Sequence, residues 1–79
     1  MALIISVAPS GEGWAVRSDL LGEEMTFEQG GRAEAAARAL ADRYAQSGRS
    51  AEVRIFLRDQ TLAGRFAHPA ADAAEALAV

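Results

Sequence analysis

The chain has 79 residues, eight of them basic and eleven acidic, and its formal net charge is −3. A chain of this length forms one domain and buries only about 60% of the surface that its unfolded form exposes. Because the core must be thin, we expect any ligand site to lie on the surface rather than in a central cavity. The negative net charge argues against strong non-specific binding to nucleic acid or to anionic lipid, since both need a cationic surface.

The sequence contains no cysteine, which excludes disulfides, thiolate zinc sites and thiol nucleophiles. All eight basic residues are arginine, and together with the many alanines this composition indicates a bacterial genome rich in GC. Residues 1–7 lack a positively charged region and are too short for a signal peptide. No apolar run is long enough to cross a bilayer. We therefore expect a cytoplasmic protein that does not bind membranes.

The first part of the chain is predicted to form a three-stranded meander. Residues 2–8 and 14–19 have the pattern of strands. The turn between them contains one proline and two glycines, Pro9, Gly11 and Gly13, which predicts a hairpin. A third, short strand at 25–28 follows a turn around Gly22.

The hydrophobic period changes from two to 3.6 residues over 32–46, which predicts an amphipathic helix. Its apolar stripe consists of Ala33, Ala36, Ala37, Leu40, Ala41 and Tyr44. Gly31 is the predicted N-cap, and Gly48 suits the left-handed position after the last turn. The small alanines allow a close approach to the sheet, and Leu40 and Tyr44 fill the remaining space.

A further strand is predicted at 51–58, followed by a turn at 59–60 and a weaker edge strand at 61–67. Alternation directs one set of side chains into the core: Val53, Ile55 and Leu57. The predicted fold is α+β, with an antiparallel sheet of three to five strands packed on one amphipathic helix in the order β-β-β-α-β-β. Residues 1–67 form the single domain, and residues 68–79 form an alanine-rich tail, with a short helix at 70–77 as one option.

Three segments have a composition and spacing that are shared with a protein family: Gly13-Trp14-Ala15-Val16-Arg17, Glu34-Ala35 to Arg38-Ala39-Leu40-Ala41, and Ala51-Glu52-Val53 to Arg58-Asp59. They resemble the small bacterial proteins of the domain of unknown function 2188 family. The similarity spans roughly residues 4–65. Two positions depart from the family pattern: Gln60 stands where a glycine is usual, and Gly30-Gly31 replaces a threonine-type helix start. The resemblance implies a fold and supplies no catalytic residue.

The sharpest candidate site is a set of side chains on the sheet face away from the helix: Arg17, Arg54, Phe56 and Arg58. One hypothesis is that a second copy of the protein or the C-terminal segment covers Phe56, because an exposed apolar sheet face is normally buried. The other is that the face binds single-stranded nucleic acid, with a base on the ring and phosphates on the guanidinium groups. Asp19 and Glu28 are expected on the same face and weaken the second hypothesis.

Other conspicuous residues have simpler interpretations. Trp14 is predicted to pack under the helix, although a tryptophan beside a glycine-rich turn can also stack on a ligand. The single histidine, His68, is predicted to be a loop residue before Pro69. The sequence predicts no catalytic residue, metal site or cofactor. We therefore expect a non-enzymatic interaction or accessory module that self-associates as a homodimer, with surplus apolar surface at Phe56, Phe66 and the tail. The alternative is a nucleic-acid-binding module.

Overall fold

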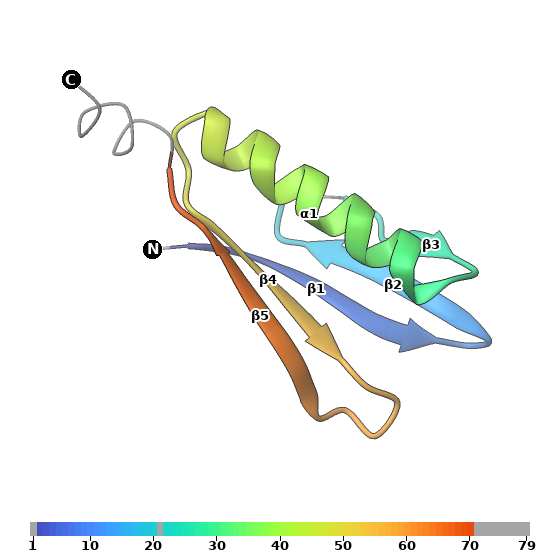
Figure 1. The fold of residues 1–79 in the computed structure, drawn as a ribbon. Coiled ribbons are helices and arrows are strands. Elements are labelled where there is room, and N and C mark those ends of the chain that lie inside the picture. The colour runs from blue at the N-terminus through green and yellow to red at the C-terminus, as the bar shows by residue number, and fades with distance from the viewer. Residues whose placement is uncertain (1, 21, 71–79) are drawn as a thin grey trace.

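The computed structural model describes residues 2–20 and 22–70. Its elements are β1 (Leu3–Ser10), β2 (Gly13–Ser18), β3 (Met25–Phe27), α1 (Gly30–Gln46), β4 (Ala51–Phe56) and β5 (Leu62–His68). The strands form one sheet in the order β3-β2-β1-β4-β5, and α1 lies across one face of it (Figure 1). The predicted α+β fold and element order are confirmed. Of the predicted tail, residues 71–79 lie outside the described part of the chain.

The sheet is mostly antiparallel, as predicted, but its central pair is parallel. Strands β1 and β4 run in the same direction, from Leu3 beside Ala51 to Val7 beside Ile55. A parallel pair needs a crossover connection, and α1 provides it. The helix returns the chain along the sheet, so that β4 starts beside the start of β1 (Figure 1).

The core lies between α1 and the three central strands. Its largest fully buried side chains are Ile5, Val7, Val16 and Val53. Against them lie three helix residues with no exposed surface, Ala33, Ala37 and Ala41. Because the side chains on this side of the helix are alanine methyl groups, the helix and the sheet pack closely. Leu40 and Tyr44 are half-buried and contact the edge of this cluster, where they were predicted to fill space.

Leu57 does not belong to the core, contrary to the prediction. Val53 is fully buried and Ile55 is partly buried, but Leu57 is 47% exposed. The reason is geometric, because the end of the β4–β5 hairpin extends beyond the helix (Figure 1). At the level of Leu57 the start of α1 lies over Trp14 of β2, so no helix covers this part of the hairpin.

The two ends of α1 differ in how well the sequence predicts them. The N-cap is Gln29 rather than Gly31, and it makes no side-chain capping hydrogen bond. At the other end Gly48 has φ +91°, as predicted. The amide of Gly48 donates to the carbonyl of Ala45, and the amide of Arg49 donates to that of Tyr44. This pair of bonds is the Schellman motif, which satisfies the last carbonyls of the helix.

The turn between β4 and β5 is held by local hydrogen bonds. The hydroxyl and the amide of Thr61 both donate to Oδ1 of Asp59, at 2.6 and 3.1 Å. These bonds, that of the hydroxyl first, lower the pKa of Asp59 below its ordinary value. The next residue, Gln60, has φ +68° and is the only non-glycine residue with a positive φ in the described part of the chain. The position is therefore one that glycine would occupy without strain.

Replacing Gln60 with glycine is expected to raise the free energy of unfolding by about 1 kcal/mol, because the left-handed region is costly for a residue with a Cβ. Gln60→Ala is the matched control, since it keeps the Cβ and should leave stability unchanged. Urea denaturation of the three proteins measures the difference. A Gln60→Gly protein that is less stable than the alanine variant would show that the strain is absent.

Candidate functional site

A row of side chains crosses the sheet on the face opposite α1. Arg17 follows the buried Val16, and Arg54 follows the buried Val53, so both point away from the helix. The pairing registers align Arg17 with Ser6 and Ser6 with Arg54, and they place Arg54 opposite a further arginine on β5, Arg65. No helix in the described part of the chain covers this face (Figure 1).

Phe56 and Arg58 extend this row toward the β4–β5 turn. Phe56 is half-buried and follows an irregularity in the β4–β5 pairing, and it lines the same depression as Arg17. Arg58 lies in the turn, where its Nη1 donates to the carbonyl of Gly11 at 3.4 Å. Around them is a shallow depression of about 420 Å³, lined by Ala8, Pro9, Arg17, Phe56, Leu57, Arg58 and Gln60.

The structure therefore gathers all four predicted residues on one surface and adds Arg65. We name this surface the arginine face, and it consists of Arg17, Arg54, Phe56, Arg58 and Arg65. Arg65 was missed because Gly64 interrupts the pattern of its strand and left its orientation unassigned. The pairing of Val53 with Phe66 fixes that orientation, since it directs Phe66 toward the helix and its neighbour away from it.

Two of the four arginines have carboxylate partners. Nε of Arg17 lies 2.5 Å from Oε2 of Glu24, and Nε of Arg54 donates to Oε2 of Glu52. Such partly exposed pairs contribute little to stability. Among the described residues, no carboxylate pairs with Arg58 or Arg65. Asp19 and Glu28 were expected on this face, but the carboxylates that pair with its arginines are those of Glu24 and Glu52.

The arginine face also contains a like-charged pair. Arg54 and Arg65 lie directly opposite each other on neighbouring antiparallel strands. Like charges in this arrangement destabilise a sheet, and Glu52 compensates only one of them. The free protein thus has an unbalanced positive charge at the centre of the β4–β5 pair.

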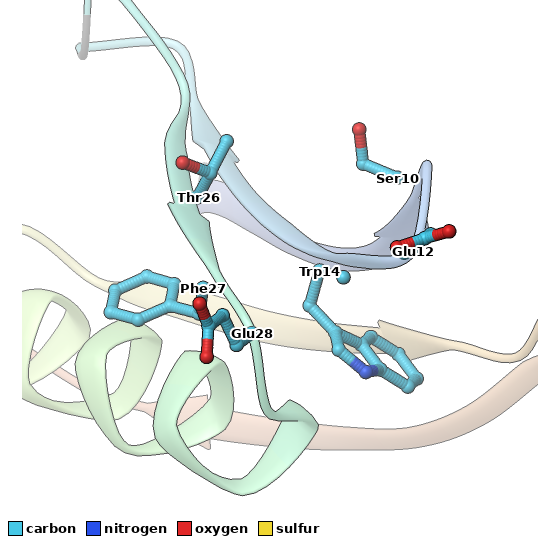
Figure 2. A pocket seen from close by; sticks show the side chains of 7 residues that line it. Ser10, Glu12, Trp14, Thr26, Phe27 and Glu28 are labelled. Atoms are coloured by element: carbon cyan, nitrogen blue, oxygen red, sulfur yellow. The ribbon is translucent and has the colours of Figure 1, made fainter.

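Trp14 packs against the start of α1, in accord with the prediction, and is half-buried. A Cβ on Gly30 would lie 2.9 Å from Cε2 of the indole, so the glycine makes room for the ring. Beside it is an open hollow of about 620 Å³ at the β2–β3 end of the sheet. Figure 2 shows that its side chains point in different directions, with Trp14 and Phe27 on one side of the strands and Ser10 and Thr26 on the other. These groups do not converge on one ligand position.

The helix side of β5 is packed rather than free. Phe66 was predicted to be surplus apolar surface, but it contacts the core, and the guanidinium carbon of Arg38 lies 4.0 Å from its ring centroid. This is a cation–π contact. His68 is the last residue of β5 rather than a loop residue, and its Nδ1 lies 4.0 Å from Oδ1 of Asp42.

Comparison with protein-family models, curated proteins and solved structures finds no match to this chain. The resemblance to the domain of unknown function 2188 family stays a prediction. Within residues 2–20 and 22–70, no three His, Asp or Glu side chains are grouped so that they could hold a metal ion. The helix that the structure describes is not long and apolar enough to cross a membrane.

Proposed function

We propose that this protein is a non-enzymatic interaction module and that its binding surface is the arginine face. One observation supports the proposal most directly. Side chains from three strands and one turn lie together on a sheet face that no described element covers. The groups gathered there are guanidinium groups, a phenyl ring and small side chains. Arginine remains protonated and cannot accept a proton, so this set suits binding rather than acid–base chemistry.

The charge of the arginine face indicates an anionic partner. A symmetric dimer through this face would place its arginines against those of the second copy, with only Glu24 and Glu52 to compensate. Like-charge contacts across an interface are costly and suppress such pairings. The edge strand β5 presents the same obstacle, because Arg65 lies near its middle and a charged edge discourages strand pairing.

Self-association, which the sequence favours, is the second candidate function, and a different observation supports it. Residues 10–29 contain five carboxylates against one arginine, whereas residues 49–69 contain four arginines against two carboxylates. The first segment includes β3, at one edge of the sheet, and the second includes β5, at the other. Opposite charges at opposite edges favour head-to-tail contacts between copies.

Sedimentation velocity over a range of protein concentrations tests this second candidate. Head-to-tail association predicts a sedimentation coefficient that rises with concentration at low salt and falls back in 0.5 M NaCl, because salt screens exposed charges. A protein that stays monomeric at several hundred micromolar in low salt would eliminate it.

Matched variants test the leading proposal without assuming a partner. The tagged Phe56→Ser/Arg65→Ser protein alters the arginine face, and Ala39→Ser/Arg43→Ser alters the exposed side of α1. Both proteins are expressed in the host of origin and purified beside the unaltered protein. We expect the face variant to lose a co-purifying component that the helix variant retains. Loss of that component only from the helix variant, or identical composition of all three samples, would contradict the proposal.

A further inference from the structure

We infer that the partner of the arginine face is a single-stranded nucleic acid. This inference rests on the proposed function and names the ligand class that the surface would take. Three features of the face carry it: the spacing of its cations, the position of its aromatic ring, and the like-charged pair at its centre.

The cations form a line that suits a chain of phosphates. Arg17, Arg54 and Arg65 belong to β2, β4 and β5, and the registers place them in one row. With strands about 4.8 Å apart, this row extends roughly 14 Å across the sheet. A polymer that crosses the strands would thus meet Arg17, then Ser6 of β1, and then Arg54 and Arg65. Arginine suits this role because its planar fork donates two parallel hydrogen bonds to a phosphate.

The aromatic ring is placed beside this line. Phe56 lies two residues from Arg54 on β4, about 7 Å along the strand, and it lines the same depression as Arg17. Its depression is bounded by the aliphatic groups of Ala8 and Pro9 and by two arginines. A base can stack on such a ring while its phosphates contact the row. Stacking of this kind needs an unpaired base, which a fully paired duplex does not offer.

The pairing of Arg54 with Arg65 leaves one positive charge that Glu52 does not balance. Directly opposed like charges weaken the β4–β5 pair, and a phosphate between them would convert this repulsion into two attractive contacts. Binding and stability should therefore respond in opposite directions to the loss of Arg65. A residue whose only role is structural would not behave in this way.

The inference can be tested by fluorescence anisotropy in 20 mM NaCl with dT15, a single-stranded oligothymidine of 15 nucleotides that carries a 5′-fluorescein label. We expect Phe56→Ala to weaken binding at least about fivefold, the low end of what one stacked base contributes. Arg65→Thr should weaken binding and reduce the slope of log K against log salt by about 0.7, the value for one phosphate contact on a single strand. The same variant should melt at a higher temperature than the unaltered protein, so its weaker binding cannot result from unfolding. Arg43→Thr on α1 is the charge-matched control and should bind nearly as the unaltered protein does.

The competing outcomes are distinguishable. A 15-base-pair duplex or heparin that binds as tightly as dT15, with Phe56→Ala without effect, would show a general polyanion surface and overturn the inference. No binding of dT15 in 20 mM NaCl would also overturn it. In either case the co-purification experiment still decides whether the arginine face is an interaction surface, because it does not depend on the class of partner.

Discussion

The Ile5→Ala variant is expected to lose about 2 to 5 kcal/mol of unfolding free energy, the range for truncating a large buried aliphatic side chain. Ile5 has no exposed surface and lies on β1, the middle strand of the sheet, facing the alanine stripe of α1. A small domain has few other large side chains to compensate. The loss is therefore a large share of a total stability on the order of 4 to 12 kcal/mol for a chain of this length.

The neighbouring residue supplies a matched control. Ile4 has the same side chain but points to the opposite face of β1, and it is only partly buried. Ile4→Ala should cost clearly less than Ile5→Ala in urea denaturation of the two variants at low protein concentration. Equal losses would mean that both faces of the sheet are covered, which would contradict the account of a one-sided core.

The second large effect is expected at Gly13, where Gly13→Ala should cost about 3 kcal/mol, the upper part of the range for overpacking. A Cβ at this position would lie 2.3 Å from the carbonyl oxygen of Phe27. Because that atom belongs to the backbone of β3, no side-chain rotation relieves the contact. Strand β3 must move away from β2, and the packing of Trp14 and Phe27 against the core is lost with it.

Gly31 provides the comparison for this substitution. A Cβ there would meet nothing within 4 Å, and the residue lies in the first turn of α1. Gly31→Ala should therefore stabilise the protein by about 0.5 to 1 kcal/mol through the better helix propensity of alanine. Thermal denaturation followed by circular dichroism measures both changes. A Gly13→Ala protein as stable as the Gly31→Ala protein would show that β3 does not pack closely on β2.

Local periodicity is sufficient to predict most of this fold. The alternation around Val16 and Val53 and the 3.6-residue stripe through Ala37 each depend only on neighbours in the sequence, and each predicts the buried side correctly. The arginine face follows from the same alternation, because it is the complement of the core. The sequence alone therefore predicts Arg17 and Arg54 on this face.

The features that the sequence did not predict depend on distant parts of the chain. The parallel pairing of β1 with β4 is decided by the path of the helix over the sheet. The exposure of Leu57 depends on which strand the helix covers at that level of the sheet. The need for a glycine at position 30, the first residue of α1, comes from the indole of Trp14, which occupies the space that a Cβ would take. None of these three features can be predicted from the residues that are adjacent in the sequence.

The most direct test of the arginine face is an amide ¹H–¹⁵N titration of the protein with unlabelled dT15. The account predicts that the largest shift changes occur at Ser6, Arg54, Phe56 and Arg65, with little change at residues 33–45 of α1. Shift changes confined to the helix, or spread evenly over both faces, would contradict it.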